Sequence, residues 1–212
     1  MGRHSLAALG IFIALWAGFA PPAAAHSPKL HEKPAAGATA APALPANFPV
    51  AFGGAFALTD HEGRARTDED FLGRYLLVYF GYTNCADICP NDLQVLSDAL
   101  DGLGRRAEAV QPLFITADPA RDTVAHLKAY VANFHPRLIG LTGTEAQVHA
   151  AARAYRVHRL KVTPSASEGP MDYLVSHGSL TYLMDRNGRF LTLMPHGTDA
   201  ERMAEVIGKY VK

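Results

Sequence analysis

The sequence has little cysteine and no excess of charge of either sign. Only two of its 212 residues are cysteines, and its 20 basic side chains are matched by 20 acidic ones. Because balanced charge produces no large electrostatic field, the composition argues against nucleic acid or an acidic membrane surface as the partner. Two cysteines also allow no more than one disulfide, so any covalent staple within the chain is a single one.

Both cysteines lie in one short stretch, Gly81–Pro90, which reads GYTNCADICP. An apolar run at 75–80 precedes it and an amphipathic pattern at 92–100 follows it, so we expect a buried strand, a tight loop and a helix. A thiol at a helix N-terminus lies beside unpaired N–H groups and the positive end of the helix dipole, which favours thiolate. A thiolate is both a redox nucleophile and a soft metal ligand, so we expect chemistry at Cys85 and Cys89.

A purely structural disulfide is the alternative for this pair. The spacing places the cysteines one helical turn apart, and Cα atoms about 6 Å apart permit a disulfide. Closing so short a loop, however, removes only about 2 kcal/mol of unfolded-chain entropy, against about 4.7 kcal/mol for a 100-residue loop. A chain that needed its one staple for stability would place it across more sequence.

The N-terminal region indicates export. Residues 1–25 combine Arg3, an apolar run and a small-residue end, which is typical of a signal peptide, although an uncleaved membrane anchor is the alternative. Residues 26–47 form an Ala/Pro-rich linker, and residues 48–212 form one domain. Export places the thiols in an oxidising compartment such as a bacterial periplasm, where the protein is soluble or tethered to the inner membrane.

Strand and helix patterns alternate along the predicted domain. We expect strands at 75–80, 110–116, 138–141, 155–162 and 173–175, helices at 92–100, 123–134, 144–153 and 199–210, an N-terminal hairpin of 51–58 with 65–67, and a late hairpin of 180–184 with 189–194. This order predicts an α/β fold with a sheet covered on both faces. A loop between an early strand and its helix is a usual place for a functional site in such a sheet.

Four blocks of the sequence resemble the signature of the SCO/SenC family. In chain order they are FGYTNCADICP at 80–90, FITADPARDT at 114–123, LIGLTG at 138–143 and YLVSHGSLTYLMD at 173–185. The resemblance covers most of residues 50–210. It implies a thioredoxin-like fold that binds one copper ion per domain through two cysteines and a histidine. It also implies delivery of that copper to the dinuclear copper site of a terminal oxidase subunit, or reduction of that subunit's cysteines.

The resemblance assigns the copper ligands. By the motif match, Cys85 and Cys89 are the thiolate ligands and His177 is the imidazole ligand. This donor set suits copper, because thiolates favour Cu(I) while an imidazole makes Cu(II) tolerable. The second block also contains acidic and basic side chains, to which we assign loop structure and no contact with the metal: Asp118, Arg121 and Asp122.

The sequence departs from the family pattern near these ligands. Ser176 stands where the family often has Asp, which removes a carboxylate that could orient the imidazole. Asn84 and Ala86 replace a common His and Pro, and either change can alter thiol pKa or copper retention. The other possible donors have ordinary structural interpretations as chain end, surface, loop or packing residues: His26, His31, His61, His196, Met171, Met184 and Met194.

Three functions use the same cysteines. The first is a copper-binding assembly factor, working with a copper-accepting oxidase subunit, for which Cys85, Cys89 and His177 are all essential. The second is a metal-independent periplasmic thiol–disulfide oxidoreductase with a thioredoxin-like reductant, for which His177 is dispensable. The third, a peroxide-removing thiol enzyme, lacks an identifiable peroxidatic setting. A monomer is the expected state.

Overall fold

The computed structural model describes residues 52–165 and 169–212. The predicted signal peptide, the predicted linker, and with them His26 and His31, lie outside the described residues. Among the helices described, none is both long and apolar enough to cross a membrane.

A seven-stranded mixed sheet forms the centre of the domain, in the order β2-β1-β5-β4-β3-β8-β9. Three neighbouring strands, β3, β4 and β5, are parallel, and the strands outside them are antiparallel to their neighbours. The strands are β1 (Ala57–Asp60), β2 (Ala65–Thr67), β3 (Tyr75–Gly81), β4 (Val110–Thr116), β5 (Ile139–Thr142), β8 (Leu180–Met184) and β9 (Phe190–Pro195).

Strand β3 lies inside this sheet and is buried on both faces. Leu77 and Tyr79 belong to one hydrophobic cluster, whereas Leu76, Val78 and Phe80 belong to the other. Because side chains alternate between the faces of a strand, a strand covered on both sides reads as an unbroken apolar run. The apolar run at 75–80 is therefore explained by the helices that cover β3 on both faces of the sheet.

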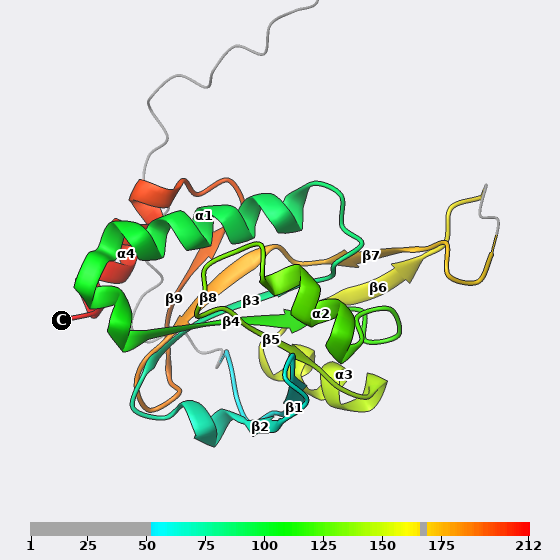
Figure 1. Ribbon diagram of the computed structural model, residues 1–212, viewed down its shortest axis with the longest axis horizontal. Coiled ribbons are helices and arrows are strands. Elements are labelled where there is room, and N and C mark those ends of the chain that lie inside the picture. Colours follow the sequence, from blue (N-terminus) through cyan, green and yellow to red (C-terminus); the bar gives the residue numbers. More distant parts are fainter. Residues whose placement is uncertain (1–51, 166–168) are drawn as a thin grey trace, which may run out of the picture. The chain divides into compact units, whose positions relative to one another are not determined.

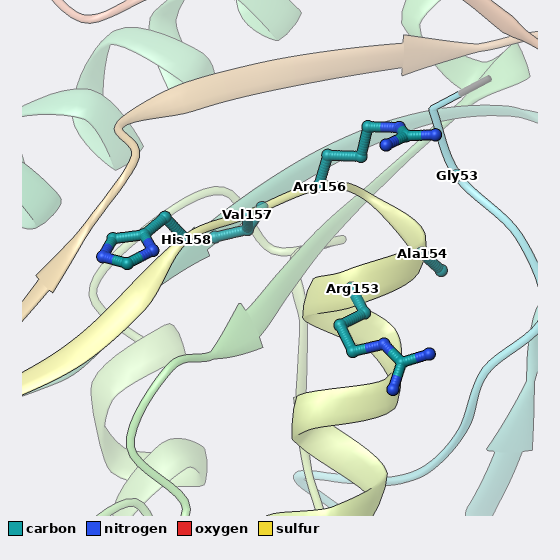
Figure 2. A pocket seen from close by; sticks show the side chains of 6 residues that line it. All are labelled: Gly53, Arg153, Ala154, Arg156, Val157 and His158. Atoms are coloured by element: carbon teal, nitrogen blue, oxygen red, sulfur yellow. The ribbon is translucent and has the colours of Figure 1, made fainter. Parts of the chain in front are cut away.

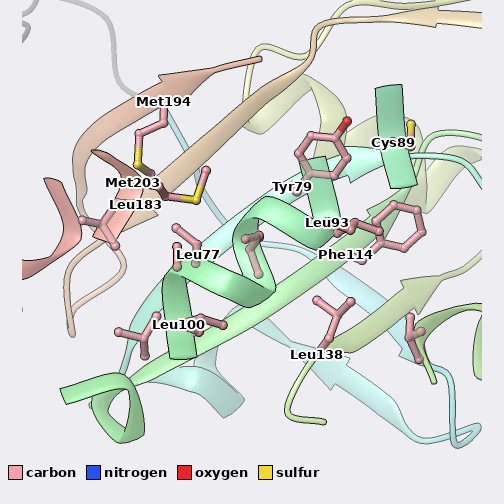
Figure 3. Packing of buried hydrophobic residues seen from close by; sticks show 14 of the residues in the cluster. Leu77, Tyr79, Cys89, Leu93, Leu100, Phe114, Leu138, Leu183, Met194 and Met203 are labelled. Carbon is pink, nitrogen blue, oxygen red and sulfur yellow. The ribbon is translucent and has the colours of Figure 1, made fainter. Parts of the chain in front are cut away.

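Helices cover both faces of the sheet (Figure 1). On one face, α1 (Ile88–Leu103), α2 (Val124–Val131) and α4 (Ala200–Tyr210) bury apolar side chains in the first cluster. Figure 3 shows this packing, with Leu93 and Leu100 of α1 and Met203 of α4 close to strand residues. On the other face, α3 (Glu145–Ala154) contributes to the second cluster. Two short 3₁₀ segments complete the helical elements, η1 (Asp68–Phe71) and η2 (Gly104–Ala109).

A separate two-stranded sheet is formed by β6 (Arg159–Val162) and β7 (Leu174–His177). The strands are antiparallel, with Arg159 opposite His177. Figure 1 shows β6 and β7 side by side near the end of β4. The Arg159 Nε donates a hydrogen bond of 2.6 Å to the carbonyl of Ala117, the residue that follows β4. This contact ties the small sheet to the edge of the main sheet where the cysteine loop also begins.

The α/β architecture, the N-terminal hairpin and the late hairpin are confirmed, but several predicted boundaries were wrong. The first strand of the N-terminal hairpin, predicted at 51–58, is Ala57–Asp60. The strand predicted at 155–162 begins only at Arg159, because Tyr155 caps α3 and packs against the rings of Phe80 and Tyr182. The residue after it, Arg156, has a positive φ of 56°, which turns the chain out of the helix. The helix predicted at 123–134 ends at Val131, and the one predicted at 92–100 runs from Ile88 to Leu103.

Candidate metal centre

The two cysteines lie on either side of the point where the loop after β3 enters α1. Cys89 is in the first turn of α1 and is fully buried, whereas Cys85 lies in the loop and is partly exposed. Both are free thiols. The prediction that they sit one turn apart on a helix was wrong, because Cys85 precedes the helix. Its sulfur instead accepts a hydrogen bond from the backbone N–H of Cys89 at 3.5 Å, and so occupies the N-terminal end of α1.

The buried position of Cys89 determines its ionisation. Burial raises the pKa of the Cys89 thiol from its ordinary value of 9.0 to about 12, against an opposing backbone hydrogen bond from Tyr82. The prediction that the helix N-terminus favours the thiolate therefore fails for Cys89, since desolvation exceeds the effect of the helix dipole. In the metal-free protein this sulfur is a neutral thiol.

Asp122 holds the cysteine loop in place. Its fully buried carboxylate accepts hydrogen bonds from the Thr83 hydroxyl and the Thr116 hydroxyl, each 2.6 Å long, and from the Thr83 backbone N–H at 3.2 Å. Burial still raises the pKa of Asp122 above its ordinary value. Thr116 ends β4 and Thr83 lies two residues before Cys85, so one carboxylate joins the strand end to the loop.

A second network joins the end of β4 to β7, the strand that carries His177. Arg121 forms an ion pair with the buried Asp118, donates to the carbonyl of Tyr173 at 3.0 Å, and stacks over the Tyr173 ring at 3.9 Å. The Tyr173 hydroxyl in turn donates to Asp118 at 2.7 Å, and burial beside that carboxylate raises the pKa of Tyr173 to about 12. These contacts agree with the structural role expected for Asp118 and Arg121.

His177 meets the buried cysteine at the end of β7. Its Nε2 lies 3.5 Å from the Cys89 Sγ, although 88 residues separate the two in the sequence. Its Nδ1 lies 3.2 Å from the carbonyl of Gly178, and its ring packs edge-on against the Tyr82 ring at 5.8 Å. Because a carbonyl only accepts, Nδ1 carries the proton and Nε2 turns its lone pair toward the sulfur. Burial lowers the pKa of His177, which also favours the neutral ligand form.

Ser176, which stands where the family often has Asp, does not lie where it could orient the His177 ring. Ser176 is exposed and lies opposite Leu160 on the other face of the small sheet from His177. The carbonyl of Gly178 makes the orienting contact to the imidazole that a carboxylate commonly makes to a ligating histidine. The departure from the family pattern therefore leaves the ring oriented.

A pairing of two side chains that are far apart in the sequence lies next to Cys89. Asp92, one turn along α1 from Cys89, is mostly buried, and its Oδ1 lies 2.7 Å from the Nδ1 of His196. The spacing of Cys89 and Asp92 could have indicated a shared helix face. No local signal pointed to His196, which is 104 residues away in the chain. His196 thus pairs with a carboxylate and does not join the cysteines.

The remaining candidate donors have structural surroundings. Met184 and Met194 are buried in the two hydrophobic clusters, as their packing interpretation predicted. The same interpretation was wrong for Met171, whose side chain is exposed. The expectation of a surface position for His61 was wrong in part. Its side chain is only 18% exposed, and its Nδ1 accepts a hydrogen bond of 3.1 Å from the backbone N–H of Gly140 in β5.

The donor set suits a soft metal ion, but it is not fully assembled. Within residues 52–165 and 169–212, no group of three or more His, Cys, Asp or Glu side chains is already arranged to hold a metal ion. Cys89 and His177 are in contact, while the sulfur of Cys85 is directed at the N–H of Cys89. Two sulfurs and one imidazole nitrogen fit copper.

An open pocket of about 690 Å³ lies elsewhere, where α3 ends and the chain leads to β6 (Figure 2). It is lined by Gly53, Arg153, Ala154, Arg156, Val157 and His158. None of the three predicted ligands lines it, so it is separate from the cysteine site.

Comparisons with known proteins identify the relatives of this chain. A family model described as SCO1/SenC matches residues 45–212. The protein called sco1 of Schizosaccharomyces pombe is 39% identical over 159 residues, which cover 74% of this chain and 60% of that protein. The chain therefore spans less than two thirds of that relative's length.

Two similar solved structures hold copper. The crystal structure of yeast Sco1 with copper bound is 40% identical, with a TM-score of 0.69, and the match covers 76% of this chain and 89% of that one. The crystal structure of Arabidopsis thaliana ScoI with copper bound is 37% identical, with a TM-score of 0.69, covering 74% and 96%. Together with the family match, these likenesses show that the sheet and its helices form a thioredoxin-like fold and that this chain belongs to the SCO1/SenC family.

Proposed function

We propose that this protein binds one copper ion through the sulfurs of Cys85 and Cys89 and the Nε2 of His177, and delivers it to a copper-accepting subunit of a terminal oxidase. The observation that carries this proposal is the 3.5 Å approach of His177 Nε2 to Cys89 Sγ. A histidine brought to a buried thiol from a distant strand, with its lone pair directed at the sulfur, is the arrangement that ligation of one ion requires. Membership of the family and the copper held by similar solved proteins support the choice of metal.

Loading requires a proton to leave Cys89. Because Cys89 is a neutral thiol with a pKa of about 12, the metal must compete with its proton, and binding releases that proton. Cu(I) is suited to this competition because it binds thiolates strongly. The sulfur of Cys85 completes the donor set from the loop side, where it lies against the N–H of Cys89.

The difference in exposure between the proposed ligands determines the side from which an acceptor reaches the copper. Cys89 is buried and His177 is half-buried, whereas Cys85 lies in a partly exposed loop beside the exposed Asn84 and Ala86. An acceptor's thiol therefore reaches the ion from the side of Cys85, which is the first ligand to be replaced. The copper then passes by ligand exchange, with no covalent intermediate on this protein.

A metal-independent thiol–disulfide oxidoreductase is less well supported. Burial keeps Cys89 protonated across the physiological range, so Cys85 alone would have to supply the attacking thiolate. The likeness to solved proteins that hold copper favours the metal-binding function. Reduction of an acceptor's cysteines remains compatible with the same pair as a step before copper transfer. The N-terminal apolar run supports the proposal that the domain works outside the cytoplasm, in a periplasm, free or tethered to the inner membrane. We propose that it acts there as a monomer.

The test measures both binding and transfer. The reduced protein is loaded with Cu(I) in competition with a chromophoric chelator, and then mixed with a metal-free copper-accepting domain of an oxidase subunit. Wild type is expected to bind one equivalent and to lose it to the acceptor, whereas Cys85→Ser and Cys89→Ser bind at least a hundredfold more weakly, since two thiolates are needed to hold Cu(I). His149→Ala, an exposed histidine on α3, is the matched control. Tight binding by Cys89→Ser would contradict the proposed ligand set.

A further inference from the structure

Tyr79 carries a buried hydroxyl that the fold leaves without a partner. The residue lies on β3, fully buried in the cluster beneath α1 (Figure 3). Its hydroxyl oxygen makes no hydrogen bond of ordinary geometry within the described residues. A buried hydroxyl without a partner costs about 1–3 kcal/mol, so a phenylalanine would give the metal-free fold more stability at this position.

Cys89, one of the predicted copper ligands, lies near the Tyr79 ring. A Cβ placed on Gly81 would lie 2.9 Å from the Tyr79 Cε1 and 3.0 Å from the Cys89 Sγ, so ring edge and sulfur converge on the same point. Figure 3 shows the Tyr79 hydroxyl and the Cys89 sulfur at the same end of the cluster. After burial, the charges of Cys89 and Asp92 and the nearness of both groups to the hydroxyl raise the pKa of Tyr79. Asp92 is already paired with His196, which leaves Cys89 as the acceptor.

We infer that the Tyr79 hydroxyl donates a hydrogen bond to the Cys89 sulfur when that sulfur is a copper-bound thiolate. This inference rests on the proposed copper function. A thiol is a weak acceptor, whereas a hydrogen bond to an ionised acceptor is about twice as strong as one between neutral groups. The hydroxyl lies near Cys89 but makes no hydrogen bond of ordinary geometry in the metal-free protein, and it gains a strong one on loading. Tyr79 is therefore a positioning residue and not a copper ligand.

The hydrogen bond also changes which oxidation state the site prefers. A donor at a ligating sulfur withdraws electron density from the metal–sulfur bond, and the potential of thiolate-bound copper depends on hydrogen bonding around that sulfur. The sulfur carries more charge in the Cu(I) complex than in the Cu(II) complex, so the hydrogen bond stabilises Cu(I) more. Tyr79 would thus hold the cargo in its reduced form during transfer.

Tyr79→Phe tests this by removing one oxygen atom. The metal-free variant is expected to unfold at the same temperature as wild type or a higher one, because a buried group without a partner is lost. The loaded variant is expected to keep one copper, but its ratio of Cu(I) to Cu(II) dissociation constants rises about tenfold, for a net hydrogen bond to a charged group. For one electron this corresponds to a fall of about 59 mV in potential. The thiolate-to-Cu(II) absorption is expected to move to lower energy.

Tyr155→Phe is the matched control, because Tyr155 is equally buried but lies in the cluster on the opposite face of the sheet. It is expected to leave the ratio and the absorption unchanged. If Tyr79→Phe binds copper with the wild-type ratio and spectrum, the hydrogen bond to the sulfur is refuted while the proposed copper function stands. If wild type binds no copper through the cysteines and His177, the proposed function fails, and the inference fails with it.

Discussion

Gly81 is the last residue of β3, and its missing side chain leaves space that the Cys89 sulfur occupies. A Cβ at this position would lie 2.8 Å from the Phe114 Cε2, 2.9 Å from the Tyr79 Cε1 and 3.0 Å from the Cys89 Sγ. Real Cβ atoms essentially never come within 3.0 Å of another atom, so the Phe114 and Tyr79 rings would have to shift, and the Cys89 sulfur would have to give by a few tenths of an ångström. All three neighbours are fully buried. We therefore predict that Gly81→Ala displaces Cys89 and damages the metal centre.

The size of this effect follows from the packing. Adding a methyl group to a filled core costs about 1–3 kcal/mol, and each kcal/mol lowers the melting temperature of a domain this size by about 2–4 °C. Gly81→Ala is expected to lower the melting temperature of the metal-free protein by about 2–12 °C. Its affinity for Cu(I) is expected to fall at least tenfold, because the sulfur no longer lies in position against His177.

Differential scanning calorimetry and Cu(I) competition measure the two effects. Gly102→Ala is the matched control: it lies in α1, is exposed, and its added Cβ would be 3.8 Å from the Ala204 Cβ, an ordinary contact. Replacing an exposed glycine inside a helix is expected to raise stability by about 0.5–1 kcal/mol and to leave copper binding unchanged. If Gly81→Ala melts at the wild-type temperature and binds copper equally tightly, the reasoning from close packing is wrong.

Two further predictions follow from the surroundings of the cysteines. Asp122→Asn places an amide against the hydroxyls of Thr83 and Thr116. It is expected to lower the free energy of unfolding, measured by urea titration, by about 1–3 kcal/mol. An unchanged urea midpoint would contradict the role of Asp122 in holding the cysteine loop. In the metal-free protein at pH 8, iodoacetamide is expected to modify Cys85 first, because Cys89 is buried with a pKa of about 12. Since the pKa of Cys89 is raised, its thiolate fraction rises about tenfold per pH unit below pH 12, and its rate of modification is expected to rise with it. Peptide mapping measures that rate, and a rate that does not depend on pH would refute the prediction.

Much of the architecture could be predicted because its cause is local. The apolar run of β3, the alternation of strands and helices, and the Asn-Gly turn of the late hairpin each follow from short-range patterns. The turn has the expected geometry, with the Asp185 Oδ1 accepting from the backbone N–H groups of Asn187 and Arg189. The boundary at Tyr155 could not be predicted, since its position is set by packing against aromatic rings from other strands.

The candidate site, too, could be predicted only in its local features. The position of the cysteines after a buried strand was readable from the sequence, but the state of Cys89 was not, because burial depends on the whole fold and here exceeds the helix dipole. His177 had no local partner and was assigned only through the family resemblance. The pairing of Asp92 with His196 had no signal at all, since it joins a helix to a loop that meet only in three dimensions.

The ligand set is tested most directly by a copper titration of the reduced full-length protein, comparing wild type with His177→Ala and with the control His149→Ala. Metal analysis gives the stoichiometry, and the thiolate-to-Cu(II) absorption gives the ligation. We predict that wild type and His149→Ala each bind one equivalent tightly, and that His177→Ala loses tight binding and the wild-type absorption. Equal affinity and an identical spectrum for His177→Ala would contradict the account, because the contact between His177 and Cys89 would then have no part in holding the metal.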